Sequence, residues 1–424
     1  MTGTRTILTG LYPERAARTL RKRSVTDDTA QTGPEAASHK ACGLDLEVVR
    51  DFAAFEALEN DWNSLFQRAG QCHQLFQTYN WNWHWCQSYL VPDGADSDLK
   101  LSVVVGRRDG RAVMIRPLIT IRHMGVGYIC WMGAPVSQYS DVIIEDAPEK
   151  MDWMNASWRF ICADLAGDMV CIPKVREDSV LWALLQQLGV RPDQETEAPY
   201  ADLAKAGTYD VYASRFSSRQ RKNRRRQRRR LSEHGEISFE VLKKGPAAAA
   251  AAQQAIDMKR LWLEKQALVS KAFSDRRIDA FFSSALASGE RPAGCEVGVL
   301  KVGDETAAIE IGVACNGRLA SHICVYSLDQ KFVQSGAGGI VTDDTIRHCL
   351  DGDIDTFDLM APADPYKYEW TDAAVKVCDY AVPLTSRGHA YAALGACTYA
   401  AKAAFETAPQ RLRRVFLNII GRKR

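Results

Sequence analysis

Two polar residues that could carry acid–base chemistry stand inside apolar runs in the second half of the chain. Glu310 interrupts "TAAIEIGVAC" and His322 interrupts "RLASHICVYS", and both runs have the alternation of β-strands. Tyr326 ends the second run. A half-buried carboxyl or imidazole has a shifted pKa, so Glu310 and His322 are candidate general bases and Tyr326 is a candidate acid. The alternative is that the first two face solvent and that the tyrosine packs in the core.

A second group of reactive side chains follows a short predicted strand, "DTFDLMA". Asp358 lies near the end of that strand, and Tyr366 and Lys367 follow in "PYKYEW". Loops after strand ends often carry functional side chains. We therefore predict catalytic roles for Asp358 and Tyr366, and we predict that Lys367 binds a phosphate or an acidic sugar. A surface lysine without a role is the alternative.

Two other segments are candidates for binding. The glycine-rich "QSGAGG" is predicted to be a loop between a strand and a helix, where backbone N–H groups hold anions and glycine lets a ligand approach closely. Its candidate contacts are Gln334, Ser335, Gly336, Gly338 and Gly339. In "WNWHW", Trp81 and Trp85 share a helical face that could stack on a sugar ring or a base. An ordinary connector and a core cluster are the respective alternatives.

The order of these segments resembles a known family. A meander followed by a glycine-rich segment and a helix is similar to the acyl-CoA site of the GNAT acetyltransferases, whose loop reads Gln/Arg-x-x-Gly-x-Gly/Ala; here Ala337 stands at the first required glycine. Over roughly residues 45–385 the chain resembles the CelD/BcsL-like (BioF2-like) acetyltransferases, which have a tandem GNAT fold related to the FemABX transferases. The resemblance rests on "WNSLF", "FQTYNWNWHW", "RPLI", "MGAPVSQYSDVII", "RRRL" and "FDLMAPADPYKYEW".

This resemblance implies an acyltransferase with no bound cofactor, which moves an acyl group, acetyl being the expected one, from acyl-CoA to an amine or hydroxyl. Members of the family accompany cellulose or exopolysaccharide biosynthesis, which implies a small-molecule or glycan acceptor. Because the glycine motif is degenerate, two alternatives stay open. One is a FemABX-like transferase that uses aminoacyl-tRNA. The other is a catalytically degenerate GNAT scaffold protein.

An arginine-rich segment raises the question of a polyanionic partner. From 215 to 230, ten of sixteen residues are Arg or Lys, Arg224 and Arg225 among them. Ser217 or Ser218 is a candidate N-cap, so the segment is predicted to be a helix. Positive charges on one helix repel each other, so we expect an anionic partner: CoA phosphates or an anionic glycan or lipid first, and tRNA only under the alternative above.

The elements that must position these residues occur in the same order twice: helix, helix, antiparallel meander, helix, strand. Asp109-Gly110 and Asn316-Gly317 mark turns of the two meanders. We predict an α+β (α/β) chain of two tandem GNAT-like subdomains with central mixed sheets, at 43–205 and 206–387. A flexible leader at 1–42 precedes them, and a helical basic tail at 388–424 that could lie on an anionic membrane surface follows.

Composition and spacing exclude several classes. The net charge is +2, which is not typical of a dedicated nucleic-acid binder, and no DNA partner is expected. Twelve cysteines without a CxxC pair indicate reduced thiols in a cytoplasmic protein, at most peripheral at the inner face of a membrane. Eight histidines form no HxH or HExxH pattern, so no metal site is predicted.

Overall fold

The structure is a computed structural model, and it describes residues 39–41, 43–91, 98–393, 405, 408–409 and 411. The predicted leader lies almost entirely outside the described residues, as does most of the predicted basic tail. None of the described helices is long and apolar enough to cross a membrane.

The first half alternates helical segments and strands. In chain order its elements are β1 (His39–Ala41), β2 (Leu44–Val49), α1 (Phe52–Ala57), α2 (Glu59–Ala69), η1 (Leu75–Gln77), α3 (Tyr79–Trp85), η2 (Cys86–Leu90), β3 (Leu99–Leu101), β4 (Val103–Arg108), β5 (Arg111–Arg116), β6 (Leu118–His123), β7 (Val126–Trp131), β8 (Ile143–Ile144), α4 (Lys150–Asp164), β9 (Met169–Arg176), α5 (Val180–Gln187) and β10 (Gln194–Asp202).

The second half starts with three short or basic helices and continues as a meander between helices. Its elements are α6 (Leu203–Ala206), α7 (Tyr209–Ser214), α8 (Ser218–Ser232), β11 (Ile237–Leu242), α9 (Pro246–Lys265), α10 (Lys271–Ser274), α11 (Arg277–Ala287), β12 (Cys295–Val302), β13 (Glu305–Cys315), β14 (Arg318–Tyr326), α12 (Gln330–Ser335), α13 (Ala337–Asp351), β15 (Thr356–Asp358), η4 (Lys367–Glu369) and β16 (Ala373–Pro383).

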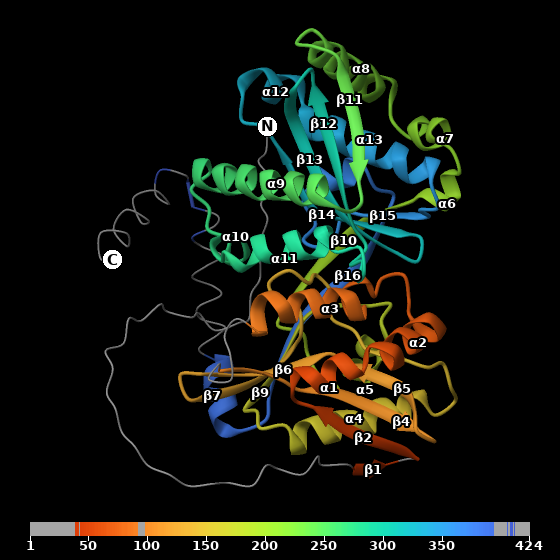
Figure 1. The fold of residues 1–424 in the computed structure, drawn as a ribbon, viewed down its shortest axis with the longest axis vertical. Helices are drawn as coiled ribbons and strands as arrows, with labels where there is room; N and C mark the ends of the chain where they lie inside the picture. The colour runs from red at the N-terminus through yellow and green to blue at the C-terminus, as the bar shows by residue number, and fades with distance from the viewer. Residues whose placement is uncertain are drawn as a thin grey trace.

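Two sheets organise these strands. A smaller sheet has the order β1-β2-β4-β5-β8, and a large mixed sheet runs β11-β12-β13-β14-β15-β10-β16-β9-β7-β6-β3. In the large sheet β10, which ends the first half, lies between β15 and β16 of the second half. Figure 1 shows the halves one above the other, with β10 and β16 running between them. The large sheet is therefore shared by the two predicted subdomains, whose boundary was placed between residues 205 and 206.

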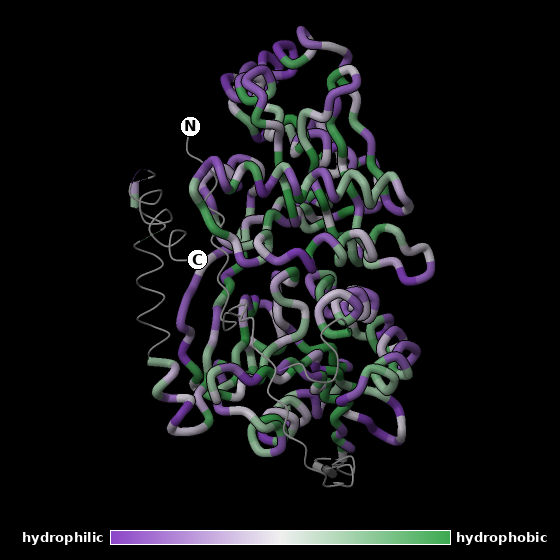
Figure 2. The backbone as a smooth tube through the Cα atoms, turned by 60° about the vertical axis from the view of Figure 1, so that its left-hand side comes forward, coloured by the Kyte–Doolittle hydropathy of each residue, from purple (hydrophilic) through white to green (hydrophobic). Residues whose placement is uncertain are grey.

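Helices cover both faces of the second half of the large sheet. Along β13, Ile309 and Ile311 pack in the core cluster that contains the apolar face of α9, whereas Glu310 points to Thr345 of α13. Since successive strand residues point to opposite faces, α9 and α13 lie on opposite sides. Figure 2 shows mostly hydrophobic chain (green) along the interior strands of both halves, and hydrophilic chain (purple) at the top, where α8 lies in Figure 1.

The predicted fold class is confirmed: the chain is mixed α/β with large mixed sheets. Ser217 caps α8 through a capping box with Gln220, as the sequence indicates. The prediction that "QSGAGG" forms a loop is wrong, because the segment is largely helical. Gln334 and Ser335 end the short helix α12, and Gly338 and Gly339 lie in the first turn of α13. The two helices abut because Gly336 adopts a left-handed conformation with φ of 72°.

Candidate functional site

The second-half sheet opens beside β14. The parallel pairing of β14 with β15 covers only Arg318–Ala320, so residues 321–326 have no strand partner on that side in the described part of the chain. On its other side β14 pairs with β13, but the register skips His322, which is the extra residue of a β-bulge. Bulges bend strands and are common beside active sites. The opening leaves backbone N–H and C=O groups of β14 free to bind a ligand.

A cavity of about 620 Å³ occupies this opening. Its walls come from both halves: residues 321–324 and 326 of β14, 359–362 after β15, and the start of α13 in the second half, and Pro135, Val136, Gln138 and Lys174 in the first half. Eight of the residues predicted from sequence line it, namely His322, Tyr326, Gln334, Gly336, Gly338, Gly339, Tyr366 and Lys367. The predicted residues that do not line it are Glu310, Ser335, Asp358, Arg224, Arg225, Trp81 and Trp85.

The N-terminus of α13 faces the cavity. No side chain caps this helix. The N–H of Gly339 donates to the carbonyl oxygen of Gly336 at 3.0 Å, so the N–H groups of Ala337 and Gly338 are the ones that can bind a ligand. A Cβ at Gly338 would lie 2.8 Å from a ring carbon of Tyr326, and a Cβ at Gly336 would lie 2.5 Å from Nε2 of Gln227. The two glycines thus allow Tyr326 and Gln227 to pack closely against the start of this helix. A helix N-terminus of this kind favours a phosphate or another anion.

Glu310 lies behind the cavity wall, under α13. Its side chain is 2% exposed, and one carboxyl oxygen accepts a hydrogen bond from Thr345 Oγ1 at 3.3 Å. Burial raises its pKa to about 7, although the hydroxyls of Ser321, Thr345 and Thr342 lower it in part. Ser321 and Thr342 also line the cavity. A carboxyl with this pKa can therefore exchange a proton with the cavity through a hydroxyl group.

His322 faces the first half of the protein. Its Nε2 lies 2.5 Å from the carbonyl oxygen of Val136, which can only accept, so the ring carries its proton on Nε2. Nδ1 is buried without a hydrogen-bond partner among the described residues. Burial lowers the pKa of His322 to about 4, with a further lowering by the charge of Lys174. The imidazole is therefore neutral at pH 7 and is a weaker base than Glu310.

Asp358 and Lys367 hold the loop that forms one wall of the cavity. Asp358 is fully buried; its carboxylate accepts hydrogen bonds from Arg318 Nη1 at 2.9 Å and from the backbone N–H of Met360 at 2.8 Å. Lys367 donates from Nζ to the carbonyl oxygens of Met360 and Pro362, both at 2.8 Å. Burial lowers the pKa of Lys367 to about 8. In this structure both residues therefore position the loop.

Two tyrosines also face the cavity. Tyr326 ends β14 and contacts the first turn of α13 at Gly338. Tyr366 precedes the short helix η4, and burial raises its pKa well above the ordinary value. The hydroxyl of Tyr366 is therefore a protonated donor at neutral pH, the state that protonation of a leaving group requires.

Trp81 and Trp85 do not have open faces. They are 0% and 1% exposed, and their indole N–H groups donate to Ser137 Oγ and to the carbonyl of Ala134. The structure thus contradicts the prediction that they stack on a ligand. Trp81 instead packs against His322, with ring centroids 5.8 Å apart, and so helps to position the bulge.

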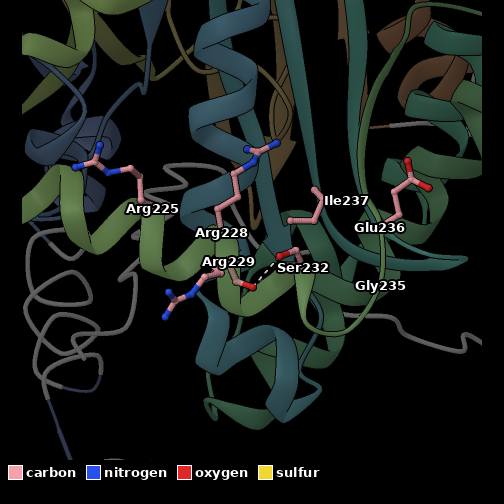
Figure 3. A pocket seen from close by; sticks show the side chains of 7 residues that line it. All are labelled: Arg225, Arg228, Arg229, Ser232, Gly235, Glu236 and Ile237. Carbon is pink, nitrogen blue, oxygen red and sulfur yellow. Dashed lines mark hydrogen bonds between the residues drawn. The ribbon is translucent and has the colours of Figure 1, made fainter.

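The arginine-rich helix packs beside α12 and α13. Arg224 has internal partners: it stacks on Phe216 and Trp370 and lies 3.3 Å from Asp343 Oδ1. Arg228 pairs with Asp344 at 2.6 Å, while Arg225 and Arg229 extend into solvent beside a shallow depression of about 580 Å³ (Figure 3). Among the described residues, the remaining Arg and Lys side chains of α8 have no carboxylate partner. This surface is strongly cationic.

Among the cavity residues that were not predicted from the sequence are two lysines, Lys174 and Lys259. They are 7% and 8% exposed. A signal existed for each. Lys174 follows a proline inside the apolar strand "MVCIPKVR", which marks a bulge. Lys259 lies on the face of α9 shared with Ala255 and Trp262, where a charged residue is out of place.

Comparison with known proteins agrees with this geometry. Residues 218–368 match the family model of the acetyltransferase (GNAT) domain. No curated protein sequence matches the chain. Among solved structures, FemX is 10% identical with a TM-score of 0.51, and the match covers 78% of this chain and 97% of FemX.

Two other solved structures match with TM-scores lower than that of FemX. L-PGS from Bacillus licheniformis is 14% identical with a TM-score of 0.45 (77% of this chain, 92% of that chain). A tandem GNAT protein from the clavulanic acid biosynthesis pathway is 10% identical with a TM-score of 0.40 (80% and 99%). The second half of the chain thus contains a GNAT-type acyltransferase domain, and the likeness to FemX concerns the fold.

Proposed function

We propose that this protein transfers an acyl group, acetyl being the expected one, from acyl-CoA to an amine or hydroxyl acceptor. The observation that carries the proposal is the opening between β14 and β15 with the N-terminus of α13 at its edge. Phosphates of the donor suit the N–H groups of Ala337 and Gly338. The free edge of β14 suits the amide groups of an extended chain. The resemblance to CelD/BcsL-like acetyltransferases supports a glycan-related acceptor.

The cavity residues supply the steps that acyl transfer needs. The acceptor attacks the carbonyl carbon of the thioester and loses a proton, which Glu310 accepts through the hydroxyl of Ser321 or Thr342. A backbone N–H at the His322 bulge donates to the oxygen on which charge develops. Tyr326 or Tyr366 gives a proton to the leaving thiolate. No metal is needed for these steps.

Acetyl-CoA binding, followed by thermal unfolding, tests the proposal. Acetyl-CoA at 100 times its dissociation constant is expected to add about 2.7 kcal/mol to the free energy of unfolding. Gly338→Val removes this gain, because a larger side chain fills the space beside Tyr326. Asp152→Val in the first turn of α4 is the matched control and keeps the gain. The proposal is wrong if acetyl-CoA and longer acyl-CoAs leave unfolding unchanged.

The cationic surface of α8 favours a second candidate, an aminoacyl-tRNA donor. Exposed cations without carboxylate partners bind polyanions with a strong dependence on salt. Arg225→Ala, Arg226→Ala and Arg229→Ala together are expected to weaken tRNA binding and flatten its salt dependence. If tRNA does not bind at low salt, the aminoacyl-tRNA donor is excluded.

A further inference from the structure

Three lysines surround one small part of the cavity. Lys367 is bound to two backbone carbonyls, and the charges of Lys174 and Lys259 both lie close enough to lower its pKa. Lys174 comes from β9 of the first half, and Lys259 comes from α9. Among the residues that line the cavity, Asp364 is the one carboxylate. The wall therefore carries an excess of buried positive charge.

The cost of burying these charges is only partly offset by the protein. Lys174 Nζ donates to the amide oxygen of Gln138, a neutral partner. Lys259 Nζ lies 4.6 Å from the ring centroid of Trp262, and the charge of Asp364 offsets its burial only in part, since the pKa of Lys259 is still lowered. Buried charges without an ionic partner are unfavourable unless a ligand supplies one.

The backbone at Lys174 adds an independent observation. Lys174 has φ of 54°, a left-handed conformation that is unfavourable for a residue with a Cβ. The register between β9 and β16 shifts at this point, and Asp379 Oδ1 accepts the backbone N–H of Lys174 at 2.6 Å. Strained residues of this kind occur mostly at ligand sites. The bulge turns the lysine out of the strand pairing and into the cavity wall.

We propose that the acceptor carries an anionic group, a carboxylate or a phosphate, which binds between Lys174 and Lys259. This inference rests on the proposed acyl transfer, since it describes the acceptor of that reaction. The anion lies where Lys174 of the first half and Lys259 of α9 line the same cavity. The acceptor's amine or hydroxyl then reaches the thioester at the bulge while its charge stays on the lysines.

A panel of matched acceptors tests the substrate class. Each pair has the same nucleophile with and without an anion: free amino acids with their amides, and glucosamine 6-phosphate with glucosamine. The anionic member is expected to have about tenfold higher kcat/KM, the value of one hydrogen bond to a charged group. Lys174→Met and Lys259→Met bring this ratio close to one, because each removes a charge that the anionic member binds. Lys301→Met, a surface lysine on β12, is the control. A ratio that either cavity variant leaves unchanged overturns the proposal.

Binding of inorganic phosphate, measured by calorimetry on protein saturated with CoA, separates the two sources of anion. Phosphate that still binds under saturating CoA, and that is lost in Lys174→Met, supports a separate acceptor site. If CoA displaces phosphate completely, the lysines hold the donor's phosphates and the proposal is wrong. Phosphate binding without any CoA binding supports the lysine site while it contradicts the proposed donor. The two proposals can therefore fail separately.

Discussion

The two halves use the same local arrangement with opposite results. In each half a strand pairs in parallel with a later strand over three residues, β7 with β9 and β14 with β15, and a helix connects the two strands. At the third position of the pairing the first half has Cys171, and the second half has Asp358. After Cys171 the strand continues to Arg176, whereas after Asp358 it ends. The cavity opens where β15 ends, and Lys174 of β9 lines it from the other half.

The helices that connect the paired strands, α13 and α4, also differ between the two halves. α13 begins with glycines and has no acidic residue in its first turn, whereas α4 follows Glu149 and has Asp152 in its first turn. Acidic residues already compensate the positive end of α4. Its neighbouring interior is filled by Trp131, Trp153 and the fully buried Arg116, which donates to Ser157 and Met154. One half thus has a cavity at the start of its connecting helix, while the other half has a packed interior there.

The largest effect is expected at the residues that differ in the paired strands. Asp358→Asn leaves Arg318 buried without its carboxylate partner and leaves Arg176 with Asp178 alone, so the free energy of unfolding should fall by about 3–5 kcal/mol in urea denaturation. Cys171→Ala removes only a small buried side chain and should cost about 1 kcal/mol. Equal losses of unfolding free energy at the two positions would contradict this difference between the halves.

The second largest effect is the pH dependence of stability that is expected from Glu310, the carboxyl group under α13. The pKa of Glu310 is raised to about 7 by burial, so the folded state binds this proton more tightly than the unfolded state. The stabilisation is present below the unfolded pKa near 4.5 and is lost as the pH rises through 7. Relative to Glu310→Gln, the wild type should lose on the order of 3 kcal/mol between pH 4.5 and 8.

Chemical denaturation at a series of pH values measures this loss. If acyl transfer also shows an inflection near pH 7 that Glu310→Gln abolishes, the carboxyl acts in the reaction. Curves for wild type and variant that stay parallel across the range would show that Glu310 does not titrate there.

The smallest effect is chemical rather than energetic, and it lies where the halves meet. The pKa of Cys72 is lowered to about 7 by a hydrogen bond from His73, with help from Arg318 of the second half. Iodoacetamide should therefore alkylate Cys72 several-fold faster at pH 7 than Cys315, whose pKa burial raises to about 11. Peptide mass spectrometry measures both rates. His73→Gln is expected to remove most of the difference, and equal rates in wild type would contradict the contact.

Local patterns in the sequence could predict the elements but not their contacts. Alternation placed Glu310 and His322 on strands, and Ser217 marked the start of α8, because these signals act within a few residues. The glycine segment was assigned as a loop, since sequence alone does not show that one left-handed residue joins two helices. Lys174 follows a proline that indicates a bulge, but the strand opposite this bulge, β16, comes about two hundred residues later, so no local pattern shows that the lysine reaches the cavity.

The place of β10 has a consequence for how the chain is made. This strand is synthesised with the first half, yet both of its neighbours in the sheet, β15 and β16, leave the ribosome much later. Until residue 383 has emerged, β9 and β10 both expose unpaired edges, which are the surfaces that aggregate or recruit chaperones. A nascent chain stalled before that point should therefore be protease-sensitive in both halves. Cleavage of the chain between 205 and 206 would give two fragments. The first would lack β15 and β16, the partners of β10, and the second would lack β10.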